Sequence, residues 1–119
     1  MDSLQIAVTC TDDPVVRLEV DGEVDMATAP QLLDSLRCAA MLHERCYIVL
    51  DLRNLTFIDC VGVSAIIEGD QRAREAHAHL IVCNPPRMVQ HLFEVTGLDD
   101  VLDVRPSWAL SNLTSGADG

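Results

Sequence analysis

The chain begins with two stretches in which apolar and more polar residues alternate, the pattern of strands that are buried on one face. The alternating apolar residues are Leu4, Ile6 and Val8 in the first stretch and Val16, Leu18 and Val20 in the second. Asp12, Asp13 and Pro14 lie between the two stretches and predict a turn, because proline cannot donate a hydrogen bond within a central strand. Asp21 and Gly22 predict the end of the second strand.

Continuous apolar runs and runs of helical period alternate over the rest of the chain. Residues 46–50 and 80–83 are apolar throughout, as expected of strands buried on both faces of a sheet, and residues 51–58 extend the first of them. Other segments repeat apolar residues every three or four positions and predict three amphipathic helices. Their predicted buried residues are Leu32, Leu36, Ala39 and Ala40, then Val63, Ile66 and Ile67, then Met88, Val89, Leu92 and Phe93. Residues 101–104 predict a short edge strand.

Polar residues and glycines mark where the helices begin and end. Thr28 is placed to cap the first helix, with Gln31 reaching back to complete a capping box, and this helix is expected to end near His43. Asp59 is the expected N-cap of the second helix. Gly97 is a natural stop for the third.

The second helix carries two further predictions. Gly69 lies inside it, and since glycine costs about 1 kcal/mol relative to alanine in a helix, we expect another element to pack closely there. Glu68 lies four residues before Arg72, and Asp70 lies four residues before Arg74. Both spacings predict ion pairs on the exposed surface of the helix.

Strands and helices alternate after residue 27, which implies an α/β fold with largely parallel strands, and the two leading strands make the sheet mixed. We predict one domain over residues 1–106. A flexible tail is predicted over residues 107–119, where the sequence becomes small and polar. The length of 119 residues leaves no room for a second domain.

The formal net charge of −11 excludes several classes of partner. Nucleic acid is a poor partner because binding phosphates needs basic residues, and an anionic membrane is disfavoured for the same reason. All eight basic residues are arginine, so the chain can form neither a Walker A loop nor a Schiff-base lysine. The amino terminus lacks the features of a signal peptide and no apolar run has membrane-spanning length, so we expect a cytoplasmic protein.

Five cysteines and four histidines are candidates for redox or metal chemistry. In the cytoplasm the cysteines are expected to be reduced thiols, and their odd number agrees with that. The histidines are His43, His77, His79 and His91. Neither they nor the cysteines have the spacing of a zinc site, so we predict no metal and no cofactor.

Three segments together resemble the STAS domain of bacterial anti-sigma factor antagonists. They are residues 22–30, which read Gly-Glu-Val-Asp-Met-Ala-Thr-Ala-Pro, residues 49–62, which include Thr-Phe-Ile-Asp, and residues 84–98, which begin Asn-Pro-Pro. The resemblance extends over residues 4–105 and implies the STAS-like mixed fold. It further implies a protein that works by binding and not by catalysis. Such an antagonist binds an anti-sigma factor, usually one with a kinase fold, and so frees a sigma factor to act in transcription.

The same resemblance identifies a contact surface and a regulatory position. In the family the anti-sigma kinase phosphorylates a Ser or Thr in a motif like Asp-Ser-Ser-Gly, and the added charge ends the binding. Here Val61 occupies the acceptor position and has no hydroxyl, so we expect that this phosphorylation does not occur. Asp25 matches the acidic residue near the acceptor. The predicted contact residues are Asp25, Met26, Thr28, Asp59, Cys60, Val61 and Gly62.

The sequence leaves further hypotheses open. Cys60 stands at a helix amino terminus, where a thiol can be activated, and it is a candidate redox switch. Cys83 is its candidate partner, because both residues follow or end buried strands and are expected at the same edge of the sheet. Ser64, one helical turn further on, is a candidate substitute acceptor. A ligand-binding regulator and a small Cys-dependent enzyme are also open hypotheses, and so is the oligomeric state.

Overall fold

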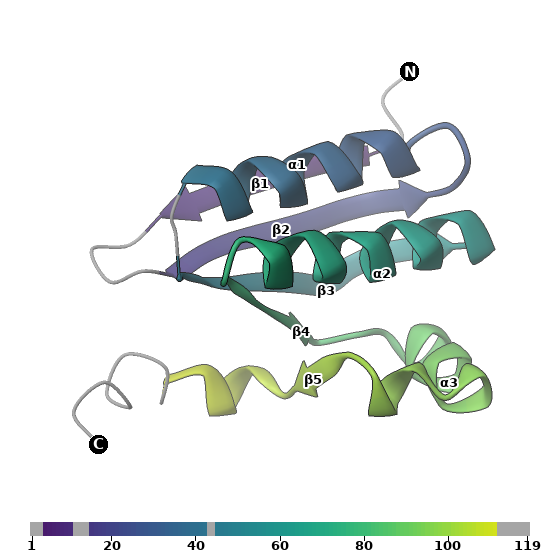
Figure 1. The fold of residues 1–119 in the computed structure, drawn as a ribbon. Helices are drawn as coiled ribbons and strands as arrows, with labels where there is room; N and C mark the ends of the chain where they lie inside the picture. The colour runs from purple at the N-terminus through teal and green to yellow at the C-terminus, as the bar shows by residue number, and fades with distance from the viewer. Residues whose placement is uncertain (1–3, 11–14, 43–44, 112–119) are drawn as a thin grey trace.

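The computed structural model describes residues 4–10, 15–42 and 45–111, which form a five-stranded sheet covered by helices (Figure 1). The strands are β1 (Leu4–Cys10), β2 (Val15–Val24), β3 (Tyr47–Ile58), β4 (His79–Cys83) and β5 (Asp103–Arg105). They lie side by side in sequence order, with β1 antiparallel to β2 and every other neighbouring pair parallel. The predicted mixed, mostly parallel α/β fold is confirmed.

Three helices connect the parallel strands. They are α1 (Ala29–Leu42), α2 (Cys60–Glu75) and α3 (Arg87–Thr96), followed by the short 3-10 helices η1 (Leu98–Asp100) and η2 (Ser107–Ser111). Gly97 ends α3 in the left-handed conformation, with φ of 75°, as predicted. Residues 107–111, the first part of the predicted flexible tail, form the turn of η2. The predicted turn at 12–14, His43 and the tail residues 112–119 lie outside the described residues.

The hydrophobic core lies between the sheet and the pair α1 and α2, which cover the same face (Figure 1). Its buried side chains among the described residues are aliphatic apart from Cys46 and Phe93. Fully buried side chains from the strands and helices include Val16, Leu18, Leu32, Leu36, Ile48, Leu50, Leu52, Ile66 and Leu80. The strand residues among them alternate along β2, β3 and β4, which is why the alternating and continuous apolar runs could be assigned to strands.

The two covering helices approach closely at Gly69, as predicted. A Cβ on this residue would lie 2.4 Å from Leu36 Cδ1 of α1, so only glycine fits without a shift of the leucine. The prediction for Asp70 was wrong in one respect: it pairs with Arg74 at 3.0 Å, but it is buried rather than exposed. Burial raises the pKa of Asp70, and Arg74 partly offsets that rise.

We predicted that the second strand ends at Gly22. That prediction is wrong, because β2 continues to Val24. Gly22 has φ of 118°, a conformation open to glycine, and the ladder to β3 shifts register between Glu19 and Asp21 and again next to Gly22. These bulges accommodate extra residues of β3, and β2 continues past Gly22. As a result Val24 pairs with Ile58, and the ends of β2 and β3 lie level with each other.

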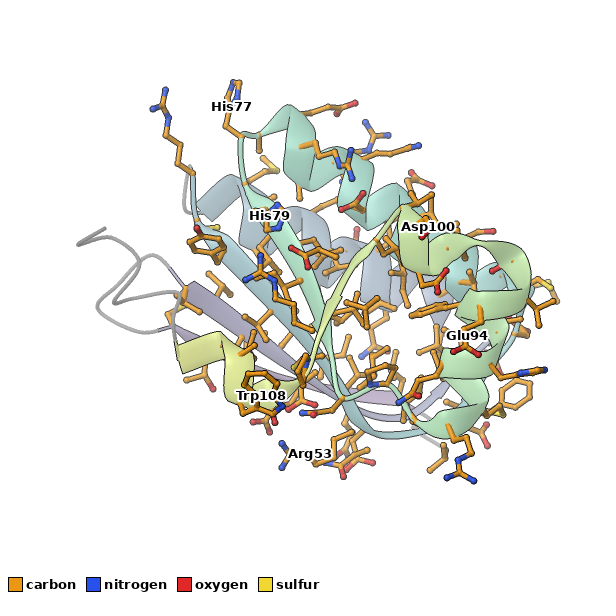
Figure 2. The ribbon with its side chains drawn as sticks, turned by 90° about the horizontal axis from the view of Figure 1, so that it is seen from below. Arg53, His77, His79, Glu94, Asp100 and Trp108 are labelled. Atoms are coloured by element: carbon orange, nitrogen blue, oxygen red, sulfur yellow. The ribbon has the colours of Figure 1, made fainter. Side chains whose placement is uncertain are left out.

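The face of the sheet opposite α1 and α2 is tied together by a buried carboxylate. Asp51 of β3 accepts hydrogen bonds from the backbone N–H of Arg53 at 3.0 Å and from Asn84 Nδ2 at 3.2 Å, and its other oxygen accepts from the guanidinium of Arg17. These contacts link β2, β3 and the end of β4. Figure 2 views the molecule from the β5 side of the sheet, with Arg53 and, on η2, Trp108 on the side away from α1 and α2.

Strand β5 is held to β4 by charged side chains. His79 Nε2 lies 2.5 Å from Asp103 Oδ2, and Arg105 donates to both oxygens of the same carboxylate, at 2.9 and 3.0 Å. Burial alone would raise the pKa of Asp103, but the hydrogen bonds from Arg105 and His79 outweigh it and lower that pKa. The strand is shorter than the predicted edge strand, since Val101 and Leu102 precede it.

Candidate functional site

The turn between β2 and α1 is closed by reciprocal hydrogen bonds between two side chains and the backbone. Asp25 Oδ1 accepts from the N–H groups of Ala27, at 2.9 Å, and Thr28, at 3.1 Å. Thr28 Oγ1 accepts from the N–H of Asp25 at 2.9 Å and donates to the carbonyl of Glu23 at 2.8 Å. Asp25 and Thr28 thus hold each other in place, and Met26 between them points into solvent, 76% exposed.

This arrangement corrects the predicted capping box. The side chain that satisfies the backbone N–H groups ahead of α1 belongs to Asp25, whereas Thr28 is buried and bonds backward to the end of β2. Gln31 does not reach back to Thr28; its Nε2 donates to the carbonyl of Leu4 at 3.4 Å. Thr28 is therefore a residue that shapes the turn, and its hydroxyl is occupied.

The turn between β3 and α2 is capped as predicted. Asp59 has an extended backbone, and its Oδ1 accepts from the N–H of Gly62 at 3.0 Å. The carbonyl of Asp59 accepts from the N–H of Val63 at 2.9 Å and so starts the helix. Cys60 and Val61, between the cap and Gly62, occupy the first turn with exposed side chains.

The two turns are joined directly to each other. The N–H of Asp59 donates to the carbonyl of Val24 at 3.2 Å. A Cβ on Gly62 would lie 2.7 Å from that same oxygen and 2.6 Å from Ile58 Cγ1, so only glycine allows α2 to start this close to the end of β2. Residues 25–28 and 59–62 thus form one continuous surface, called here the two-turn surface. The seven contact residues predicted from the sequence lie in these two turns, but Thr28 and Gly62 among them are buried.

Exposed apolar side chains lie on and beside the two-turn surface. Met26 is 76% exposed, and Val61 and Phe57 are each 43% exposed. Phe57 precedes Ile58 at the end of β3 and pairs with Glu23, which places it beside both turns. Sequence reasoning missed Phe57. Consecutive strand residues point to opposite faces of a sheet, so Phe57 lies on the face opposite to the buried Ile58.

Two carboxylates of these turns accept hydrogen bonds from the backbone. Asp25 and Asp59 each turn an oxygen toward backbone N–H groups at a helix start, where the helix dipole favours negative charge. Glu23 is exposed beside them. A partner for this surface therefore needs an apolar contact and a basic or polar rim.

The predicted pairing of Cys60 with Cys83 is wrong. Cys83 lies opposite Asp51 in the ladder, and β3 continues from there to Ile58, a length of about 20 Å at about 3.3 Å per residue, before Cys60 begins α2. Cys83 is also fully buried, and burial next to the charge of Asp51 raises its pKa to about 11. Cys60 is exposed at the two-turn surface. The sequence could not show this because the excess length of β3 over β4 becomes visible only in the pairing.

The remaining candidate residues lie elsewhere. Ser64 is exposed on the outer side of α2. His77 and His79 lie at the far end of β4, at the amino ends of the parallel strands, and His91 is exposed on α3. Within the described ranges, no three His, Cys, Asp or Glu side chains are grouped to hold a metal ion. No described helix is both long and apolar enough to cross a bilayer.

Comparisons with known proteins agree with the fold and with the resemblance seen in the sequence. The sequence model of the family described as "STAS domain" matches residues 5–110. An anti-sigma-B factor antagonist of Listeria monocytogenes serovar 1/2a is 23% identical over 103 residues, which are 87% of this chain and 90% of that protein.

Solved structures show the same architecture. An anti-sigma factor antagonist from Mycobacterium paratuberculosis superposes with a TM-score of 0.69 at 24% identity, over 86% of this chain and 85% of that one. The Bacillus cell fate determinant SpoIIAA in its phosphorylated form superposes with a TM-score of 0.70 at 17% identity, over 92% and 99%. At these identities the likeness establishes the fold.

The first prediction concerns the contact at Gly62. Gly62→Ala is expected to destabilise the protein by about 2–3 kcal/mol, because the new methyl group meets a backbone oxygen that cannot move freely. Gly69→Ala is the matched control in the same helix: it meets the movable end of Leu36 and gains helix propensity of about 1 kcal/mol, so its cost is smaller. Denaturant unfolding of both variants measures the difference. Equal stabilities for Gly62→Ala and the wild type would contradict the assigned contact.

The second prediction concerns the thiols. Iodoacetamide near neutral pH should modify the exposed Cys10, Cys38 and Cys60 and spare Cys46 and Cys83, whose pKa values are raised by burial. Peptide mass spectrometry reads each site, and the unfolded chain, in which all five should react, is the control. A Cys60 rate above that of Cys38 would support an activated thiol, whereas modification of Cys83 in the folded protein would contradict its burial.

Proposed function

The chain belongs to the STAS domain family, and we propose that within this family it acts as an anti-sigma factor antagonist. It binds an anti-sigma factor, releases the sigma factor held there and so regulates transcription. Its action is binding and not catalysis, and its site of action is the cytoplasm. The observation that carries the proposal is the pair of hydrogen-bonded turns on which Met26 and Val61 are exposed.

The contact surface is proposed to be permanently competent for binding. A phosphate at the acceptor position would add a charge of about −1.5 to −2 beside the carboxylates of Asp25 and Asp59 and would have to be desolvated in a complex. Val61 offers no oxygen for such a modification and instead presents an apolar side chain that is 43% exposed. The hydroxyl of Thr28 is buried and hydrogen bonded, so Thr28 is not proposed as a replacement phosphate acceptor.

The partner is proposed to be an anti-sigma factor with a kinase fold. Two observations support this partner. The chain belongs to the STAS domain family, and Asp59 and Gly62 match the ends of the family's Asp-Ser-Ser-Gly motif although the acceptor position is Val61. A kinase-fold partner that recognises the shape of this turn would still bind it, and would find no hydroxyl to phosphorylate at Val61.

A second candidate is a redox-regulated form of the same binding. Cys60 is exposed between Asp59 and Val61, so oxidation of its sulfur would add polar atoms to the contact surface. Binding measured with reduced protein and with protein oxidised by mild peroxide distinguishes the two candidates. Loss of affinity on oxidation in the wild type, absent in Cys60→Ser, would favour the redox form.

The third prediction tests the contact surface. Met26→Asp should weaken binding to the purified anti-sigma factor of the source organism at least about tenfold, or about 1.4 kcal/mol, because a charge replaces an apolar contact. Met41→Asp is the matched control, since Met41 is 78% exposed near the other end of α1 and the change in charge is identical. Isothermal titration calorimetry measures both. Equal losses in the two variants would place the contact elsewhere.

The fourth prediction tests the acceptor position. With the kinase-fold anti-sigma factor and ATP, the wild type and Val61→Ala should incorporate no phosphate, and Val61→Ser should incorporate about one per chain at residue 61. Intact-mass and peptide mass spectrometry read the number and place of the phosphates. Phosphate on the wild type at Ser64 would show that another hydroxyl has replaced the usual acceptor.

A further inference from the structure

The two edges of the sheet are built differently. Strand β5 is three residues long, carries Asp103 and Arg105, and is followed by Pro106. Short length, charge and proline are the devices by which edge strands avoid pairing with other chains. The edge at β5 is therefore protected.

Strand β1, at the other edge, has none of these devices. Its seven residues, Leu4–Cys10, include no charged residue, no proline and no glycine. Its ladder with β2 runs without a register shift from Leu4 opposite Gly22 to Cys10 opposite Val16. Figure 1 shows β1 on the outer side of β2, where no further described strand covers it. A straight, uncharged edge strand of this length is suited to pair with another strand.

The side chains of β1 are also incompletely buried. We predicted a strand buried on one face, but only Leu4 is buried, and Ile6 is half-buried. Val8 is 54% exposed, although it shares the core-facing side of the sheet with its ladder partner Leu18. The strand thus presents an apolar side chain at the edge that its own fold leaves uncovered.

The sequence of β1 is complementary to itself. In an antiparallel pair centred on Ala7, residue 6 of one chain lies opposite residue 8 of the other. Ile6 would then cover Val8 of the second copy, and Gln5 would lie opposite Thr9. The net charge of −11 makes two copies repel each other over most of the surface, but this strand contributes no charge to that repulsion.

We propose that β1 is an interaction surface for a second copy of this chain, which joins the two sheets as antiparallel neighbours about a dyad at Ala7. One strand pair is smaller than the standard protein interface of about 1,600 Å², so the dissociation constant is expected between about 10 μM and 1 mM. Because the charged remainder of each copy repels the other, association should strengthen as salt is added.

Sedimentation equilibrium of the full chain up to about 1 mM tests the proposal, with no anti-sigma factor present. The wild type should form a dimer, and Val8→Lys should weaken it at least about tenfold, because a charge at an edge strand opposes pairing. Val101→Lys is the control: Val101 is 51% exposed outside β1, and both variants change the net charge equally. A wild type that stays monomeric, or an equal effect of the two lysines, would overturn the proposal.

The register is tested by cross-linking. In a chain with Cys10, Cys38 and Cys60 replaced by serine, Ala7→Cys should form a disulfide dimer, since residues directly opposite in an antiparallel pair have Cα atoms about 4.5–5.5 Å apart. Gln5→Cys should not, because its counterpart would lie well beyond disulfide reach. Faster cross-linking of Gln5→Cys than of Ala7→Cys would overturn the assigned register. This experiment and the binding test at Met26 use different variants, so either hypothesis can fail alone.

Discussion

The close approach of α2 to the end of β2 is the constraint on which the binding surface depends. It requires a residue without a side chain at Gly62, because the carbonyl of Val24 occupies the space of a Cβ. It also requires β2 and β3 to end level with each other, which the register shifts that place extra residues in β3 between Asp51 and Phe57 provide. Once both conditions hold, the N–H of Asp59 bonds to Val24 and two turns become one surface. Neither turn alone would fix Met26 relative to Val61.

The residues of this surface divide into those that hold the backbone and those that face a partner. Asp25, Asp59 and Gly62 are each required by a backbone contact, through a cap or a close approach. Cys60 and Val61 make no such contact and point outward. A change at the outward positions therefore alters what the surface offers to a partner without disturbing its shape. Under the proposed function, a phospho-acceptor could therefore be replaced by Val61 with the backbone of the two turns unchanged.

Sequence reasoning succeeded where one residue type has one structural consequence. Asp59 before a helical pattern predicted a cap, and Gly69 within a helix predicted close packing, and both were confirmed. It failed where the outcome depends on elements distant in the chain. Gly22 was predicted to end a strand, because the bulge beside it is visible only in the pairing of β2 with β3. Asp70 was placed on the surface because ion-pair spacing does not show which side of a helix another element covers.

The distribution of charge decides how this protein can meet others. A net charge of −11 would repel most acidic partners, yet the carboxylates of Asp25 and Asp59 are turned toward helix amino termini, where the backbone N–H groups compensate them. Met26 and Val61 can then be desolvated without burying an unpaired charge beside them. In the proposed complex, the exposed Glu23 would face a basic group at the rim of the partner. Negative charge would then orient the partner at the edge of the contact, and the exposed Met26 and Val61 would supply its apolar part.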